Sequence, residues 1–431
     1  MKYIRLQRSE QSEATIADIV KRPTKDAVDL TVTVSAILKD VREHGDKAVM
    51  EYERKFDKAE LRELHVTEEE FEIAEQLVSN DLKTSLQQAH DNIARFHEAQ
   101  RFNGIDVETA TGVHCWQRSV AIERVGLYIP GGTAPLFSTV LMLATPAVIA
   151  GCKEIVLCTP PSKDGSVHPA ILMAARIAGV NKVFKTGGVQ AIAAMAYGTE
   201  SVPQVSKIFG PGNQYVQCAK QLVSVSGVAI DMPAGPSEVA VVADDTAYPS
   251  LVAADLLSQA EHGADSQVLL VTTSETLFNN IGAELDKQLA ALPRQAIATD
   301  ALENSRIVLV DDLSFALEII NRYAPEHLIL EIAEPHDFAQ RVINAGSIFI
   351  GHLTPESAGD YASGTNHTLP TNGYATAYSG VNLDAFCRKI TYQELSAEGI
   401  RSIGRTVELM ADAEQLYAHK NAMTLRLKLC Q

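Results

Sequence analysis

The spacing of apolar residues changes along the chain and divides it into regions of different structure. Residues 26–56 and 67–101 carry apolar side chains at helical spacing, and Thr67 and Glu70 open the second stretch with the spacing of a capping box. From about residue 119, short β-branched runs alternate with helical stretches. We therefore predict that the first quarter of the chain is mostly helical and that α/β structure follows it.

Two blocks of strand–helix alternation follow one another. The strand-like runs of the first block are VGLYI, EIVLC, KVFKT, KIFG and VAID, and its helical stretches are 138–150, 168–178, 189–196 and 213–225. In the second block the strand-like runs are 238–243, 267–273, 306–310, 327–332 and 347–351, and the helical stretches are 249–261, 275–291, 314–322 and 336–344. This alternation predicts two α/β units, each with a parallel sheet covered by helices.

Breaks in the alternation indicate where the domains meet. Proline and glycine interrupt the segment DMPAGPSE at 231–238, between the two blocks. A polar loop at 352–380 follows the second block, and helical spacing returns at 391–429. We assign the chain to an N-terminal segment at 1–25, a discontinuous α/β domain at 26–125 with 236–380, a second α/β domain at 126–235, and a helical C-terminal segment at 381–431.

The composition is typical of a globular protein. With 431 residues and 46% hydrophobic composition, the chain can bury the cores of two or three domains. Its 37 lysine and arginine residues against 54 aspartate and glutamate residues give a net charge of −17, so we expect neither nucleic acid nor a membrane as a partner. The N-terminus carries charges where a signal peptide is apolar, and the longest apolar run, 139–151, is too short to cross a bilayer.

The six cysteines are scattered and form no CxxC pair. We therefore expect neither a disulfide framework nor a thiolate zinc site, which agrees with a reducing cytoplasm. Cys152 and Cys158 remain candidates for a nucleophile, although Cys158 lies in the strand-like run EIVLC, where burial is the simpler explanation.

Three glycine-rich loops follow strands of the first block. They are GLYIPGG, TGGVQA and FGPGN, and they place Tyr128, Gln190 and Asn213 after a strand or at a helix start. Ligands of open α/β sheets bind beyond the carboxyl ends of strands, and glycine lets the backbone approach a phosphate. The alternative is a set of turns without a ligand. The GxGxxG fingerprint is absent, so spacing alone does not identify a dinucleotide.

Oxygen and nitrogen donors for a metal occur in three places. Gln259 and His262 share a face at the end of a predicted helix, and Asp360 and His367 lie in SAGDYASGTNHTLPTNGY, a stretch too rich in small residues for a helix. Together with His419, these residues would suit zinc, manganese or cobalt. Taken alone, the Gln/His pair is more often a surface or capping feature.

Two further pairs contain possible acid/base groups. Glu326 and His327 lie at the mouth of a predicted strand, where a bend at Pro325 would be needed for both to serve one substrate. A simple ion pair is the alternative. Glu414 and His419 are five residues apart, so on an unbroken helix their side chains diverge by roughly 140° and would not bind one ion.

Taken together, these segments resemble the histidinol dehydrogenase family over essentially the whole chain. The most specific stretches are GLYIPGG, FGPGN, DMPAGPSE, LLSQAEHG, PEHL and ESAGDYASGTNHTLPT. The resemblance implies two incomplete Rossmann-like α/β domains with parallel sheets, a helical N-terminal region and a helical C-terminal extension. It also implies zinc-dependent oxidation of L-histidinol to L-histidine through L-histidinal with two NAD+, the last step of histidine biosynthesis.

The resemblance assigns roles to particular residues. It implies one Zn2+ per subunit bound by Gln259, His262, Asp360 and His419; NAD+ contacts from Tyr128, Gln190 and Asn213; and acid/base roles for Glu326 and His327. Substrate would contact Ser237, His367 and Glu414, together with the zinc ligands and His327. The family is homodimeric, and its C-terminal segment, here with Glu414 and His419, completes the partner's site. A zinc-dependent hydrolase and a non-catalytic metal-binding protein remain the alternatives.

Overall fold

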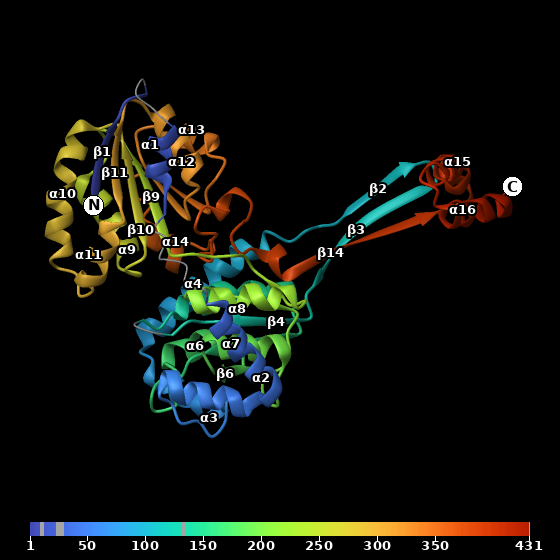
Figure 1. Cartoon of the computed structure of the whole chain (residues 1–431), viewed down its shortest axis with the longest axis horizontal. Helices are drawn as coiled ribbons and strands as arrows, with labels where there is room; N and C mark the ends of the chain where they lie inside the picture. The colour runs from blue at the N-terminus through green and yellow to red at the C-terminus, as the bar shows by residue number, and fades with distance from the viewer. Residues whose placement is uncertain (9–12, 23–29, 132–133, 431) are drawn as a thin grey trace.

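The computed structural model describes residues 1–8, 13–22, 30–131 and 134–430. Figure 1 shows two helix-covered sheets next to each other and an arm that extends away from both, ending in two helices. None of the helices within the described ranges is both long and apolar enough to cross a membrane.

The first body is built on a parallel six-stranded sheet in the order β1-β11-β10-β9-β12-β13. Its strands are β1 (Lys2–Leu6), β9 (Glu238–Ala243), β10 (Gln267–Thr272), β11 (Arg306–Val310), β12 (His327–Glu331) and β13 (Ser347–Ile350). Its helices are α1 (Glu13–Val20), α9 (Pro249–Ala260), α10 (Glu275–Leu289), α11 (Gln295–Glu303), α12 (Leu313–Tyr323), α13 (Pro335–Arg341) and α14 (Glu356–Tyr361). Helices α9, α10 and α11 bury one face of the sheet, and α1, α12 and α13 bury the other, which explains why β9 is apolar throughout after Glu238.

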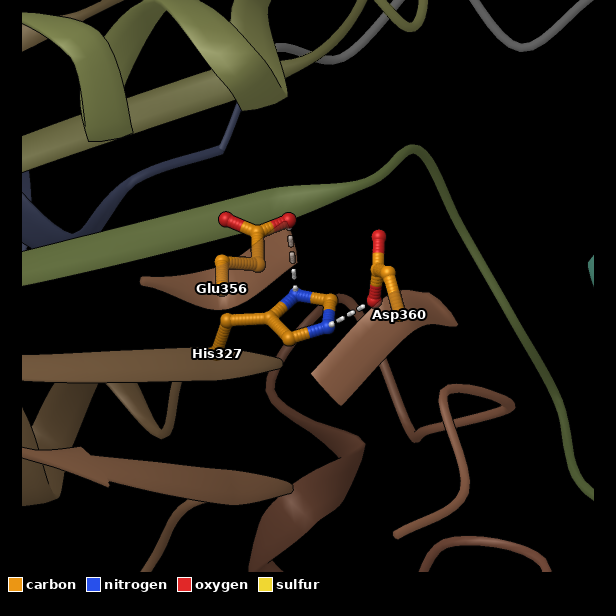
Figure 2. A group of neighbouring side chains, drawn as sticks. All are labelled: His327, Glu356 and Asp360. Carbon is orange, nitrogen blue, oxygen red and sulfur yellow. Dashed lines mark ion pairs between the residues drawn. The ribbon is translucent and has the colours of Figure 1, made fainter. Parts of the chain in front are cut away.

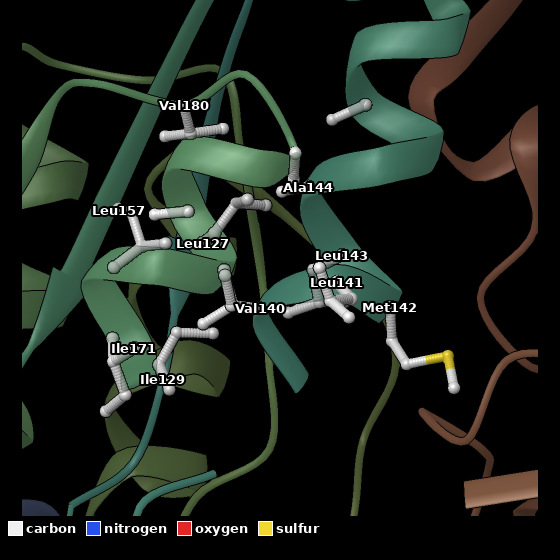
Figure 3. Packing of buried hydrophobic residues seen from close by; sticks show 14 of the residues in the cluster. Leu127, Ile129, Val140, Leu141, Met142, Leu143, Ala144, Leu157, Ile171 and Val180 are labelled. Carbon is white, nitrogen blue, oxygen red and sulfur yellow. The ribbon is translucent and has the colours of Figure 1, made fainter. Parts of the chain in front are cut away.

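The second body has a parallel five-stranded sheet in the order β6-β5-β4-β7-β8. Its strands are β4 (Arg124–Tyr128), β5 (Glu154–Thr159), β6 (Val183–Lys185), β7 (Lys207–Phe209) and β8 (Ala229–Ile230). The intervening helices are α5 (Phe137–Ala150), α6 (Pro169–Ile177), α7 (Gly188–Tyr197) and α8 (Gln214–Val225). Figure 3 shows part of one core, in which Leu127 of β4, Val140 of α5 and Ile171 of α6 pack together. All strands expected in both blocks are therefore confirmed.

The helical N-terminal region packs on the five-stranded sheet. Its elements are α2 (Thr31–Tyr52), which continues as the π-helical turn η2 (Glu53–Asp57), α3 (Glu68–Leu77) and α4 (Asn80–Glu98). Helix α2 contacts α7 and α8, α3 contacts α6, and α4 contacts α5 and α6. Grouping residues 26–125 with 236–380 was therefore wrong, because apolar spacing shows which helix face is buried but not which sheet it covers. Residues 26–29 lie outside the described part of the chain.

Two local predictions in this region have different outcomes. The capping box is confirmed, since Glu70 N donates to Thr67 Oγ1 at 3.3 Å and Thr67 N donates to Glu70 Oε2 at 2.8 Å. The single helix expected at 67–101 is instead two helices, because Ser79 caps a new start by accepting from Leu82 N at 3.3 Å.

The arm combines segments from both ends of the chain. Antiparallel strands β2 (Ile105–Ala110), β3 (Val113–Ala121) and β14 (Cys387–Leu395) form a sheet in the order β14-β3-β2, followed by α15 (Ala397–Ala413) and α16 (Tyr417–Leu429). The prediction of helix over 391–429 was wrong for its first five residues. They pair with β3, a strand far away in the sequence, and that pairing overrides local helical spacing.

Glycine and a buried ion pair fix the FGPGN loop after β7. Gly210 adopts a φ of +125°, and a Cβ there would lie 2.0 Å from the carbonyl oxygen of Tyr128. Lys220 Nζ lies 2.5 Å from Asp231 Oδ1 and donates to Gly210 O at 2.8 Å, while Gly210 N donates to Asp231 Oδ2 at 2.8 Å. Both charged side chains are buried, so the loop conformation depends on their pairing.

Replacing Lys220 by methionine should leave the Asp231 carboxylate buried without a counter-charge. We expect Lys220→Met to lower the free energy of unfolding by about 3 to 5 kcal/mol, measured by urea denaturation. The exposed Lys153, which pairs with Glu123 at 3.2 Å, provides the control: Lys153→Ala should cost less than about 1 kcal/mol. Adding Asp231→Asn to Lys220→Met should recover part of the loss. Equal effects of Lys220→Met and Lys153→Ala would contradict this account.

Candidate active site

The acid/base pair lies at the amino edge of the six-stranded sheet. Glu326 precedes β12 and His327 opens it, and both side chains are buried. His327 Nδ1 lies 3.7 Å from Glu326 Oε2, so the two side chains converge although the residues are adjacent. The predicted bend occurs one residue before Pro325, at Ala324, which has a φ of +48°. This convergence places a carboxyl group and an imidazole at one point, as acid/base chemistry requires.

Helix α14 brings two more carboxylates to His327. Glu356 and Asp360 are four residues apart and therefore share one face of the helix. Asp360 Oδ1 lies 3.5 Å from His327 Nε2, and Glu356 Oε1 lies 3.7 Å from His327 Nδ1 (Figure 2). Ligand atoms of these three residues all lie within 4.8 Å of one another, so they could hold a metal ion. The prediction of no helix over 357–374 was wrong for its first five residues, which lie in α14. Glu356 was missed because only α14 brings it to the site.

Gln259 and His262 approach this group from the end of α9. With the amide of Gln259 oriented to satisfy both neighbours, its nitrogen donates to Glu356 Oε1 and its oxygen accepts from Glu238 N at 2.9 Å. His262 lies on the exposed turn after α9, within electrostatic reach of Asp360. The structure therefore brings together three of the four expected zinc ligands, Gln259, His262 and Asp360.

His367 connects the two bodies. Its Nδ1 donates to the carbonyl oxygen of Asp360 at 2.9 Å, and its Nε2 lies 3.1 Å from Thr139 Oγ1, near the start of α5. Burial lowers the pKa of His367, and a neutral ring with its proton on Nδ1 can accept from the Thr139 hydroxyl. His367 therefore lies where the amino edge of one sheet meets the carboxyl edge of the other.

Glu238, the first residue of β9, contacts most of these groups. Its backbone N–H donates to Glu326 Oε2 at 2.9 Å, and its carbonyl oxygen accepts from His327 Nδ1 at 3.3 Å. Its buried carboxylate accepts from Arg22 at 2.5 and 2.9 Å and from Asn372 N at 2.9 Å. Sequence reasoning missed Glu238 and Arg22, because residues 216 positions apart gave no sign that they pair.

Burial and like charges shift the protonation equilibria of this cluster. Burial raises the pKa of Glu326 and of Glu356, each to about 8. Burial alone lowers the pKa of His327, but the carboxylates of Glu356, Glu326 and Asp360 raise it to about 10. Burial also acts to raise the pKa of Asp360, but its hydrogen bond to His327 and the neighbouring His367 outweigh burial and lower it. Without a bound cation, the carboxylates around His327 therefore favour the protonated imidazole.

The predicted cofactor residues gather at the carboxyl edge of the five-stranded sheet. The hydroxyl of Tyr128, at the end of β4, accepts from Gly188 N at 3.1 Å. Buried Gln190 donates to Glu53 Oε1 at 2.8 Å. Asn213 caps α8 by accepting from Tyr215 N and Val216 N at 3.0 and 3.1 Å. The described residues of the three loops therefore lie at one edge of the sheet, and Gly132 lies outside the described part of the chain.

The remaining predicted residues lie in two places. Ser237 adjoins Glu238, and its carbonyl oxygen accepts from Gln267 N at 3.2 Å. Glu414 and His419 are exposed at the end of the arm, which Figure 1 shows extending away from both sheets. Between them Gln415 has a φ of +59° and separates α15 from α16, so the two residues do not lie on one unbroken helix. This chain therefore does not bring its own Glu414 and His419 to the cluster.

Comparisons with known proteins agree over nearly the whole chain. A family model described as histidinol dehydrogenase matches residues 20–427. A histidinol dehydrogenase from Bacteroides thetaiotaomicron is 63% identical over 427 residues, which cover 99% of this chain and 99% of that protein. This chain belongs to the histidinol dehydrogenase family. The Escherichia coli histidinol dehydrogenase is 51% identical over 412 residues, covering 95% of this chain and 94% of the relative.

A solved structure confirms the fold. The crystal structure of histidinol dehydrogenase from Elizabethkingia anophelis matches with a TM-score of 0.96 at 50% identity, covering 99% of this chain and 98% of that one. Membership of the histidinol dehydrogenase family makes the chain an oxidoreductase, against the hydrolase and the non-catalytic alternatives. A cysteine nucleophile is also disfavoured, because burial raises the pKa of Cys152 to about 12 and that of Cys158 still further.

Proposed function

We propose that this chain oxidises L-histidinol to L-histidine through L-histidinal, as the last step of histidine biosynthesis. Each of the two oxidations passes a hydride to NAD+, and one water supplies the second oxygen of the product carboxylate. The convergence of Glu326 and His327 at the junction of the two bodies, beside the α14 carboxylates, is the observation that carries the proposal. Membership of the histidinol dehydrogenase family supplies the substrate class.

His327 is the base of the first oxidation, because a zinc ion bound by Asp360 would offset the carboxylate charges that raise the pKa of its ring. It accepts the hydroxyl proton of L-histidinol as the carbinol carbon releases its hydride, and the carbonyl oxygen of Glu238 orients the ring through Nδ1. Glu326 acts at the second oxidation by taking a proton from the water that hydrates the aldehyde. A carboxyl group with a pKa of about 8 exchanges its proton near neutral pH, which suits such a role.

Gln259, His262 and Asp360 would hold a zinc ion together with His419 of the partner subunit. Nitrogen and oxygen donors without thiolates fit zinc, and Gln259 and Asp360 already converge on the Glu356–His327 pair. When bound, Zn2+ supplies a positive charge that fixes the substrate nitrogens and so positions the carbinol carbon. Tyr128, Gln190 and Asn213 would contact NAD+, and Ser237, His367 and the partner's Glu414 would contact substrate.

The proposed dimer accounts for the position of the arm. Glu414 and His419 are exposed at its end and cannot reach the site of their own chain in this arrangement. Gln259, His262 and Asp360 all belong to the body with the six-stranded sheet, which supports a site completed by the arm of another chain. A second copy whose arm extends over the first would supply both residues.

The activity can be measured directly. Purified protein mixed with Zn2+, L-histidinol and NAD+ should produce NADH, and two equivalents should form for each L-histidinol consumed. Chelation should abolish NADH formation, because it removes the ion that Gln259, His262 and Asp360 would bind and that would position the substrate. Added Zn2+ should restore it. Absence of NADH under every divalent metal tested would refute the proposal.

The two acid/base residues should separate the half-reactions. We expect His327→Asn to slow oxidation of L-histidinol by about 100-fold or more, the usual contribution of a general base. Glu326→Gln should mainly slow oxidation of L-histidinal, measured with that aldehyde as the starting substrate. Exposed His336→Asn and Glu334→Gln are matched controls that should change neither rate. Small and equal effects of the two test variants on both steps would contradict the division of roles.

Co-expression of two inactive chains tests whether His419 acts in the partner's site. One chain carries Asp360→Ala and the other His419→Ala, with different affinity tags so that mixed dimers can be isolated. If the ligands come from different subunits, each mixed dimer contains one intact site and should show about half the wild-type activity per dimer. If Asp360 and His419 of one chain served the same site, the mixed dimers would be inactive.

A further inference from the structure

Glu53 is a buried carboxyl group that the proposed mechanism does not use. It opens η2 at the end of α2, and its exposed fraction is 0%. Its Oε1 accepts three hydrogen bonds, from Thr186 Oγ1 at 2.8 Å, from Gly187 N at 3.0 Å and from Gln190 Nε2 at 2.8 Å. This one oxygen therefore accepts hydrogen bonds from three residues of the turn between β6 and α7.

This turn carries the predicted cofactor contacts. Nε2 of Gln190 donates to Glu53, so the other amide atom, Oε1, points toward Gly188. A Cβ on Gly188 would lie only 3.0 Å from this Oε1. Gly188 has a φ of +58° and donates its N–H to the Tyr128 hydroxyl. The orientation of Gln190 thus follows from the position of Glu53.

The second oxygen of Glu53 faces another carboxyl group. Among the described residues Oε2 is buried without a hydrogen-bond partner, and the half-buried carboxyl of Asp57 lies close enough to interact with the Glu53 carboxyl. The wide π-helical turn η2 holds these two residues, four apart, on one side. Burial, with the Asp57 charge as a further cause, raises the pKa of Glu53 to about 8. One proton shared between the two carboxyl groups would leave one negative charge on the pair.

The topology of the sheet relates this pair to one part of the cofactor. In dinucleotide-binding α/β folds, an acidic residue after the second strand binds the adenosine ribose hydroxyls. The corresponding strand is β5, which ends at Thr159 and is followed by Pro160 and Pro161, so it offers no carboxylate there. In the order β6-β5-β4-β7-β8, strands β5 and β6 are neighbours, so the β6–α7 turn lies next to the end of β5. Glu53 and Asp57, from the turn that continues α2, supply carboxyl groups next to the β6–α7 turn instead.

We infer that Asp57, next to the positioning residue Glu53, recognises the ribose of the cofactor and makes the protein select NAD+ over NADP+. Glu53 is a positioning residue that orients Gln190, and Asp57 supplies the negative charge that repels a 2′-phosphate. The inference rests on the proposed use of NAD+. The group recognised is a ribose with two free hydroxyls and no 2′-phosphate.

Binding to the zinc-loaded protein tests the inference without relying on turnover. The probes are ADP-ribose and its 2′-phosphate, titrated by isothermal calorimetry into wild-type and variant protein. Asp57→Asn should tighten binding of the 2′-phosphate about tenfold, because one repelling charge is removed, and change ADP-ribose binding much less. Exposed Glu51→Gln, on the same helix, is the control and should leave both affinities unchanged. An unchanged ratio of affinities in Asp57→Asn would overturn the selectivity role.

Two Glu53 variants separate orientation of Gln190 from simple loss of packing. The Glu53→Gln side chain can still accept from the turn through Oε1 and donate to Asp57 through its amide, so it should bind ADP-ribose like wild type. Glu53→Ala should weaken ADP-ribose binding about tenfold by freeing Gln190 and should raise KM for NAD+ while leaving KM for L-histidinol unchanged. Weak binding by Glu53→Gln, or wild-type binding by Glu53→Ala, would overturn the positioning role.

The outcomes separate this inference from the proposed function. A wild-type protein that prefers ADP-ribose to its 2′-phosphate but does not oxidise L-histidinol would refute only the proposed function. A wild-type protein that oxidises L-histidinol while its Asp57→Asn variant keeps the wild-type preference would refute only the inference.

Discussion

Glu238 is the residue on which the arrangement of the active site depends. Its backbone N–H and C=O bind Glu326 and His327, and the same N–H reaches the amide of Gln259. Its side chain is 3% exposed and pairs with Arg22, which also donates to the carbonyl oxygen of Tyr323 at 2.5 Å. A buried carboxylate that lost this partner would be costly, so the N-terminal segment and the active site are energetically linked.

The junction of the two bodies explains why the site lies at an unusual edge. Ligands of α/β sheets normally bind at carboxyl ends, and the cofactor loops of the five-stranded sheet follow this rule. The acid/base pair instead lies at the amino end of β12. The segment 231–238 runs from the end of β8 to the start of β9, so the carboxyl edge of one sheet meets the amino edge of the other. His367 and Thr139 contact each other across this junction.

Buried carboxyl groups lie at both proposed binding sites, the one for metal and alcohol and the one for the nucleotide. The cluster around His327 gathers three carboxyl groups where a metal and an alcohol would be positioned. Glu53 gathers the backbone and side chains of the β6–α7 turn, where a nucleotide would bind. In both places burial raises the carboxyl pKa, and hydrogen bonds from neighbouring groups decide which atoms remain available to a ligand.

The sequence by itself determined the strands of both sheets, the capping box at Thr67 and the position of the glycine loops after strands, and it marked Glu326 and His327 as candidates. These features follow from local spacing, from turn chemistry and from the rule that parallel strands share their edges. Only the tertiary structure decided that α2, α3 and α4 cover the five-stranded sheet, that 387–395 is a strand, and that Glu356, Glu238 and Glu53 belong to the sites. Each of these depends on a partner many residues away, and neither periodicity nor propensity records which distant surface a side chain will meet.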